Sequence, residues 1–189
     1  IPLDMAIDAG TVRAGATTLS AATFGLALRD GRLTVSDLSA GMAGGTVNAT
    51  LDLARTGARA DLEGTVSIED ASLEDVVWRR DGRAVATGRG SLEARVSSSG
   101  FTVGGIVAGL AGDGSIRIED GELRQLNPAP FDDLAEALAA GETPADGQIA
   151  AAFARHLSSG DFRFERIEAG LDIAAGAVRA KDVTVVADR

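Results

Sequence analysis

The stretch GDGSIRIEDGELRQL, residues 112–126, decides how the rest of the chain is interpreted. Ile116 and Ile118 alternate with polar side chains, Asp120-Gly121 follows, and Leu123 resumes the alternation. A period of two is typical of a strand with one buried face, and Asp-Gly between two such runs is a strong hairpin signal. We therefore predict two strands joined by a tight turn at Asp120-Gly121.

The same alternation recurs along the whole chain. It appears at residues 3–7, 24–28, 33–35, 47–53, 62–68, 92–96, 162–164, 171–173 and 183–185, with Gly or Asp-Gly between many of the runs. This spacing is typical of a meandering antiparallel sheet. The segments LRDGRLTVSDL (28–38) and IEDGELRQL (118–126) also share an apolar-x-Asp-Gly-x-Leu order. Such a loose internal repeat suggests a sheet that grows in one direction.

Other segments have a helical period. Apolar residues recur at i, i+3, i+4 and i+7 in residues 103–110 and 131–138, and more weakly in 149–157 and 73–77. This spacing places them on one face of a helix. We predict a mainly β fold, a curved, groove-like antiparallel repeating β-sheet with three or four short helices packed on it.

Composition excludes several classes of function. The chain has 18 basic and 28 acidic residues, which disfavours nucleic-acid binding because phosphate contacts need clustered cations. It has no cysteine and one histidine, His156, so a metal site is not expected and no cofactor is predicted. Neighbouring acids such as Glu119 and Asp120 point to opposite faces of a strand and do not form a catalytic pair. We expect no enzyme.

The order of these motifs resembles the C-terminal region of the AsmA family over nearly all 189 residues. The resemblance is carried by GRGSLEARVSSSGFTVGGIVAGLAGDGSIRIEDGELRQLN (88–127) and DFRFERIEAGLDIAAGAVRAKDVTVVA (161–187). It implies a large Gram-negative envelope protein, anchored in the inner membrane with its bulk in the periplasm. It also implies a role in phospholipid movement towards the outer membrane. Because the chain opens in mid-strand, we expect residues 1–189 to be one excised region of such a protein.

The resemblance implies that the apolar face of the sheet is a groove for phospholipid or other acyl chains. The alternation supplies the candidate lining residues, which are Leu62, Val66, Ile68, Leu92, Val96, Ile116, Ile118 and Leu123. An alternative is a scaffold for outer-membrane proteins, partnered by envelope assembly proteins, in which the helices at 103–110 and 131–139 fill the groove.

The only local basic cluster is WRRDGR, residues 78–83, which contains the single Trp. Trp78, Arg79, Arg80 and Arg83 are candidates for contact with lipid headgroups or with a partner, because indole rings and arginines suit membrane interfaces. The plainer interpretation is a loop in which Trp78 packs over the edge of the sheet.

Overall fold

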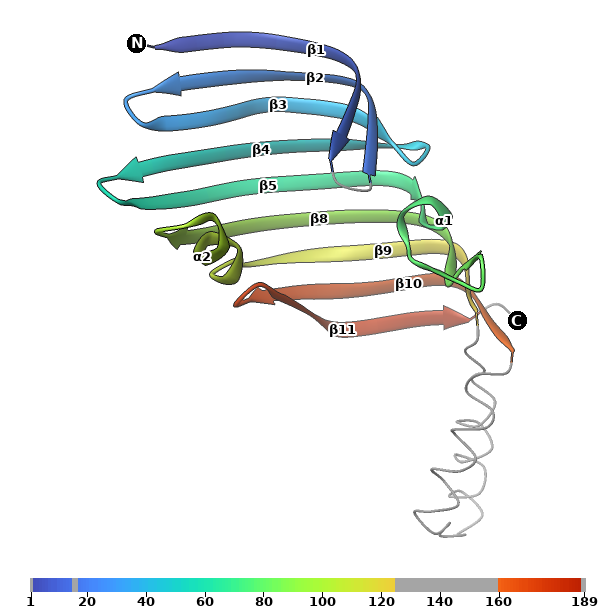
Figure 1. The fold of residues 1–189 in the computed structure, drawn as a ribbon. Helices are drawn as coiled ribbons and strands as arrows, with labels where there is room; N and C mark the ends of the chain where they lie inside the picture. The colour runs from blue at the N-terminus through green and yellow to red at the C-terminus, as the bar shows by residue number, and fades with distance from the viewer. Residues whose placement is uncertain (1, 15–16, 125–159, 188–189) are drawn as a thin grey trace, which may run out of the picture.

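A single antiparallel sheet of nine strands dominates the computed structural model, which describes residues 2–14, 17–124 and 160–187 (Figure 1). The nine strands are β1 (Leu3–Ala14), β2 (Thr17–Arg29), β3 (Arg32–Met42), β4 (Gly45–Thr56), β5 (Arg59–Ser72), β8 (Ala86–Gly100), β9 (Ala111–Arg124), β10 (Asp161–Ala174) and β11 (Ala177–Ala187). Their spatial order follows the chain, and β1 and β11 each pair with one neighbour, so the sheet is open. The predicted mainly β, antiparallel fold is confirmed.

Several consecutive strands are joined by two-residue turns in which both residues have positive φ, the conformation of a type I′ hairpin. Asp30-Gly31 connects β2 to β3 with φ of +49° and +78°, and Ala43-Gly44 and Ala175-Gly176 have similar values. Asp81-Gly82 likewise joins β6 (Arg79–Arg80) to β7 (Arg83–Ala84), a small separate hairpin. Glycine accepts positive φ without a steric cost, which explains the second position of each turn.

The predicted turn at Asp120-Gly121 is wrong. Residues 111–124 form one continuous strand, β9, and Asp120 has a φ of +49° at a β-bulge opposite Gly88 of β8. Gly121 does not have positive φ and pairs with Phe164 of β10. The chain continues straight because β8 and β10 hydrogen-bond to β9 on both sides of the bulge.

The described residues contain two short helices, α1 (Leu73–Val76) and α2 (Val103–Ala108), where three or four were expected in the whole chain. The predicted helices at 73–77 and 103–110 correspond to these two. Those at 131–139 and 149–157 lie outside the described residues. Both observed helices sit at the ends of strands, α2 between β8 and β9 and α1 after β5, at opposite ends of the sheet (Figure 1).

The sheet is curved at its N-terminal side. Near their shared hairpin, β1 and β2 bend over, and their residues Val12 and Leu19 pack against a cluster of Ala22, Ala40 and Val47 (Figure 1). Val66 and Ile68 of β5 pack against the same cluster. Residues from five successive strands meet around one small cluster only if the sheet curls, and the side on which they meet is its inner face.

Candidate functional site

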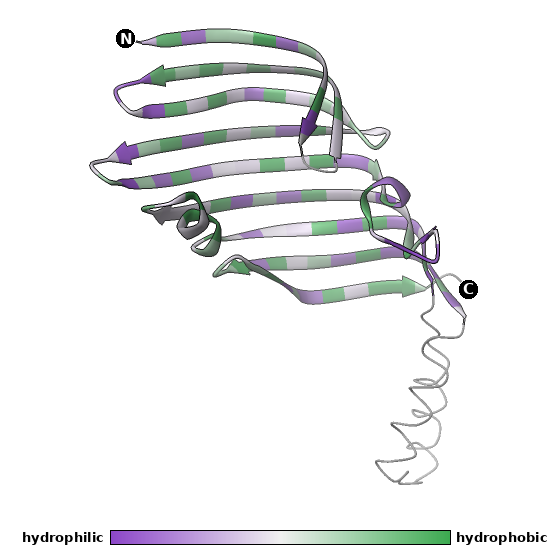
Figure 2. Cartoon of the chain, in the orientation of Figure 1, coloured by the Kyte–Doolittle hydropathy of each residue, from purple (hydrophilic) through white to green (hydrophobic). Residues whose placement is uncertain are grey.

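The inner face of the sheet is apolar from one edge to the other. Residues that are register partners in antiparallel strands point to the same face. One row of partners joins Val47, Ile68, Leu92, Ile116 and Ala169 across β4, β5, β8, β9 and β10. Along each strand the colours in Figure 2 alternate between hydrophobic and hydrophilic, as expected for a sheet with two chemically different faces.

The predicted groove residues lie on this face. Leu62, Val66, Ile68, Leu92, Val96, Ile116 and Ile118 belong to adjoining rows of β5, β8 and β9, and all are half-buried. Leu123 lies apart from them, beyond the Asp120 bulge, where it pairs with Ala86 and Phe162 near the α1 end of the sheet. The structure therefore brings together seven of the eight candidates and places the eighth at the border.

Bulges in β3, β5, β9 and β11 keep the apolar side chains of these strands on the inner face. At Asp37, Asp70, Asp120 and Asp182 the chain adopts positive φ and gains one residue relative to a neighbouring strand. Without the extra residue, the apolar side chains after it would point to the other face. Each bulge could have been recognised in the sequence, because the apolar residues of the alternation shift from odd to even positions or back. In β3, for example, they shift from Leu33 and Val35 to Leu38 and Ala40.

The inner face is only thinly covered. Ten apolar side chains of the described residues are buried, and six of these are alanines. Near the edges the large side chains are more exposed, with Met5 of β1 at 41% and Val178 of β11 at 62%. In a sandwich, a second layer would bury such a face. Among the described residues the only other sheet is the two-stranded β6–β7 hairpin, which is too small to form such a layer.

The two helices cover little of this face. Leu73 of α1 is buried against Gly90, and Ile106 of α2 is half-buried beside Gly100. The rest of the predicted apolar stripe of α2 is not packed on the sheet, since Val103 is 80% and Val107 56% exposed. We expected these helices to pack on the sheet, but each one contacts it through a single apolar residue, Leu73 in α1 and Ile106 in α2. Both contacts lie at the ends of strands.

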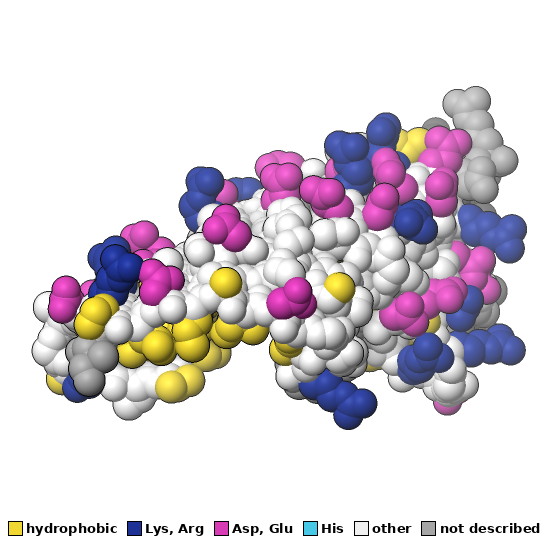
Figure 3. Space-filling view, turned by 90° about the horizontal axis from the view of Figure 1, so that it is seen from above, with side chains coloured by type: hydrophobic (Ala, Val, Ile, Leu, Met, Phe, Trp, Pro, Cys, Tyr) yellow, Lys and Arg dark blue, Asp and Glu magenta, His cyan; other side chains and the backbone are white. Residues whose placement is uncertain are grey.

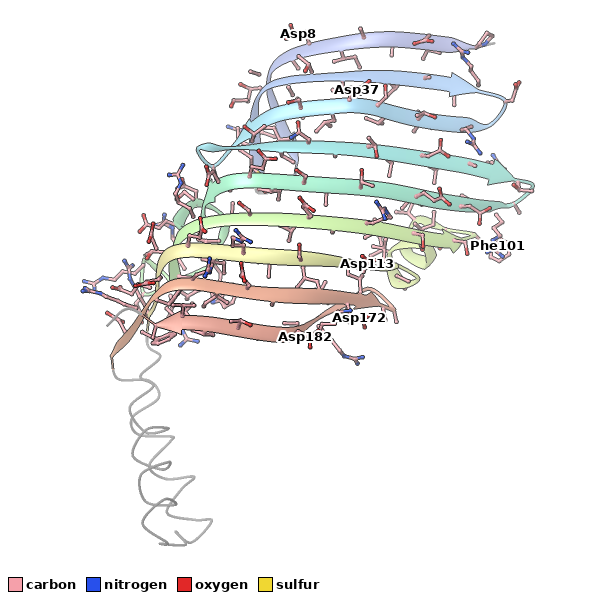
Figure 4. The ribbon with its side chains drawn as sticks, turned by 180° about the vertical axis from the view of Figure 1, so that it is seen from behind. Asp8, Asp37, Phe101, Asp113, Asp172 and Asp182 are labelled. Atoms are coloured by element: carbon pink, nitrogen blue, oxygen red, sulfur yellow. The ribbon has the colours of Figure 1, made fainter. Side chains whose placement is uncertain are left out.

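The outer face is polar and held by contacts between neighbouring strands. The hydroxyls of Thr50 and Thr65 are 2.7 Å apart, and Arg117 Nη2 lies 2.8 Å from Glu168 Oε1. Figure 4 shows this face from behind, with Asp113 of β9 and Asp172 of β10 labelled on it. In Figure 3 the acidic and basic side chains gather on this side, and hydrophobic side chains gather on the opposite, inner side. Within the described residues no group of His, Cys, Asp and Glu could hold a metal ion.

The basic cluster forms the β6–β7 hairpin, which extends from the α1 end of the sheet. Arg80 and Arg83 are register partners, and Trp78 lies two residues before Arg80, so these three side chains share one face of the hairpin. Ala84, on the opposite face, is buried. Trp78 is 72% exposed and so does not pack over the sheet edge.

Arg79 differs from the other arginines of the cluster. It shares the face of Ala84, and its guanidinium donates at 3.4 Å to the backbone oxygens of Gly82 and Glu74. Its guanidinium therefore braces the hairpin against α1. The structure separates Arg79 from Trp78, Arg80 and Arg83, which the sequence had grouped together.

An open antiparallel sheet with an apolar inner face and a polar outer face defines a class of β-sheet proteins that present one uncovered apolar surface. The AsmA family model matches residues 1–183, and the chain belongs to the AsmA family. Membership suggests a role in biogenesis of the envelope and outer membrane.

Comparisons with curated proteins and with solved structures gave no match. Among the described helices, none has the length and apolar character needed to span a bilayer.

Proposed function

We propose that this chain binds the acyl chains of phospholipids along the inner face of its sheet, without catalysis. In this proposal it is a periplasmic part of an inner-membrane-anchored protein that serves outer-membrane biogenesis. The observation that carries the proposal is the continuity of the apolar inner face across nine strands with no second layer on it among the described residues. Large exposed apolar surfaces on water-soluble domains mark binding sites for apolar partners.

The dimensions suit acyl chains. Strands lie about 4.8 Å apart, so nine of them make a face roughly 40 Å across. One leaflet of a bilayer is about 15 Å of hydrocarbon, half of the ~30 Å core. The inner face, at roughly 40 Å, is more than twice as wide as an acyl chain of about 15 Å is long, so it can hold more than one chain at a time. This width agrees with movement of lipids along the sheet as well as with binding.

The chemistry of the face favours low selectivity. It is lined mostly by aliphatic side chains and offers no buried polar or charged residue among those described. Burial of apolar surface gains about 25 cal/mol per Å² whatever the shape of the lipid tail. We expect the protein to accept acyl chains of different lengths and degrees of unsaturation with similar affinities.

Headgroups would stay in water at the border of the inner face. At the α1 end, Arg83 and Arg80 lie next to one another on the exposed face of the β6–β7 hairpin, together with Trp78. Guanidinium groups bind phosphate through charge-assisted hydrogen bonds, and an indole ring suits the boundary between apolar and polar regions. We assign these three side chains to headgroup contact.

The test is crosslinking in cells with the intact protein. A photo-crosslinking amino acid replaces Ile116, on the inner face, and in a matched variant replaces its neighbour Arg117, on the outer face. The expected result is lipid adducts at position 116 and none at 117, identified by mass spectrometry of the crosslinked peptide. Adducts with protein at position 116, and no lipid at either position, would instead support a scaffold whose inner face is covered by protein.

A further inference from the structure

At one end of the sheet, the ends of four neighbouring strands, β8 to β11, carry no charge. Between Arg95 of β8 and Asp113 of β9, which are register partners, no residue is charged, and the same is true between Asp172 of β10 and Arg179 of β11. Asp113 and Asp172 are themselves partners, so the four charged residues form one row across the sheet. We call residues 96–112 and 173–178, which lie beyond this row, the uncharged end.

The two segments of the uncharged end are in contact. The backbone N–H of Gly176, in the β10–β11 turn, donates to the carbonyl of Leu110 after α2 at 3.1 Å. Residues 96–112 are the longest run without a charge in the chain, at 17 residues, and the shorter uncharged run 173–178 lies beside it. The absence of charge is therefore a property of a surface and not of a single loop.

This surface exposes large apolar side chains. Phe101 is 76%, Val103 80%, Val107 56% and Val178 62% exposed. In Figure 4 Phe101 lies at the end of β8, beyond Asp113. Side chains of this kind are normally turned inward, and four of them around one uncharged end make an apolar surface that water solvates poorly.

The polar groups of the uncharged end are largely occupied within the chain. Thr102 Oγ1 caps α2 by accepting from the N–H of Gly105 at 3.1 Å, and Ser98 Oγ donates to the carbonyl of Ile106 at 2.6 Å. Ser99 Oγ accepts from Arg59 Nη2 at 2.5 Å. A segment that enters hydrocarbon must satisfy its backbone and hydroxyl groups internally, since lipid tails offer no hydrogen bonds. A protein interface has no such requirement.

The uncharged end is also continuous with the inner face. Ser98 is the register partner of Leu62, so Ile106, which lies against Gly100 and accepts from Ser98, borders the rows of the predicted groove. An acyl chain passing over α2 would meet apolar side chains from Val103 to Leu62 without crossing a charged row.

We propose that the uncharged end docks on a lipid bilayer by inserting Phe101, Val103, Val107 and Val178 into the boundary between headgroups and hydrocarbon. The bilayer is favoured over a protein partner because residues 96–112 and 173–178 carry no charge, and because three of their four hydroxyl side chains, those of Ser98, Ser99 and Thr102, are hydrogen-bonded within the chain. This inference rests on the proposed function, because docking at the uncharged end would bring the inner face to the bilayer from which it receives acyl chains.

The first test uses the absence of cysteine in the chain. An environment-sensitive fluorophore is attached to Val103→Cys and, as a control on the outer face, to Ser115→Cys. Vesicles of dioleoylphosphatidylcholine, and vesicles that also contain phosphatidylglycerol, are added at low and high salt. We expect a blue shift at position 103 with both vesicles at both salt concentrations, and none at position 115. A shift that appears only with phosphatidylglycerol and disappears at high salt would overturn the proposal, because apolar insertion does not depend on lipid charge.

The second test uses unlabelled variants. Val103→Asp should weaken cosedimentation with neutral vesicles about tenfold or more, because an acidic side chain is costly in hydrocarbon. Val76→Asp, at an exposed position on α1 at the opposite end, should leave it unchanged. Equal cosedimentation of the wild type and Val103→Asp would overturn the proposal. In the fluorophore experiment, a blue shift at position 103 that grows with protein concentration in the absence of vesicles would also overturn it, because the uncharged end would then bind a second copy of the chain.

A third measurement separates this inference from the proposed function. Binding of monomeric dihexanoylphosphatidylcholine reports on the inner face without a bilayer, and Val103→Asp should retain it. If the wild type docks on vesicles through position 103 but binds no short-chain lipid, the inner face is not an acyl site and the uncharged end is still a membrane contact. If short-chain lipid binds but no vesicle does, the docking proposal is wrong and the proposed function stands.

Discussion

Gly121 in β9 lies so close to its register partner Phe164 in β10 that a Cβ at position 121 would collide with the Phe164 ring. Phe164 is 2% exposed and is the largest fully buried side chain among the described residues. Its ring lies over the backbone of β9, where only a glycine leaves room. Gly121 is thus needed for packing, and not for a turn.

Gly121→Ala should therefore destabilise the fold, by about 1–3 kcal/mol, the usual cost of overfilling a packed site. The measurement is urea unfolding followed by circular dichroism. Gly10→Ala in β1 is the matched control, because nothing lies within 4 Å of a Cβ at that position. Equal unfolding midpoints for the two variants would show that Phe164 moves aside freely.

Asp120 is constrained by its backbone, since its φ is +49°. Asp120→Val should cost roughly 1–3 kcal/mol, because a β-branched residue is strained in the left-handed region. Asp120→Gly, which accepts this φ, should remain close to the wild type. Unfolding of both variants in urea tests this, and a Gly variant as unstable as the Val variant would point to a role for the carboxylate instead of the backbone.

The β6–β7 hairpin pairs Arg80 directly with Arg83. Like charges at opposed positions destabilise a hairpin, by about 0.2–1 kcal/mol on the scale of cross-strand pairs. Arg83→Thr should therefore slow hydrogen exchange in the hairpin, while weakening the binding of phosphatidylglycerol relative to phosphatidylcholine. Arg79→Thr, whose guanidinium donates to backbone carbonyls, is the control for the lipid effect. Undiminished phosphatidylglycerol binding by Arg83→Thr would remove this residue from the headgroup assignment.

The ion pair of Arg117 with Glu168 joins β9 to β10 on the outer face at 2.8 Å, and both side chains are substantially exposed. Arg117→Ala should lower the free energy of unfolding by less than about 1 kcal/mol, because water and salt screen such pairs. Lipid adducts at position 116 should not change, since the pair lies on the other face. Loss of those adducts in this variant would mean that the two faces are not independent.

The period-two pattern was enough to predict an antiparallel sheet with one apolar face, and seven of the eight groove candidates lie together as expected. Alternation is a local property, because side chains in a strand point to opposite faces whatever the strand pairs with. What covers the face is not local. The helix at 103–110 has the apolar stripe of a packed helix, yet Val103 and Val107 remain exposed, because α2 lies at the end of the strands and reaches the sheet only through Ile106.

The two Asp-Gly pairs at 30–31 and 120–121 have the same local sequence but different structures. Comparing them shows what the sequence determined and what the tertiary structure decided. Both aspartates have a φ of +49°, which the local Asp-Gly sequence favours. Gly31 also has positive φ and the chain reverses, whereas Gly121 does not and the strand continues. The difference arises because residues 32–42 pair back onto β2, while β9 is held on both sides by β8 and β10, and Phe164 packs over Gly121. The sequence specified where the backbone bends, and long-range strand pairing determined whether the bend became a turn or a bulge.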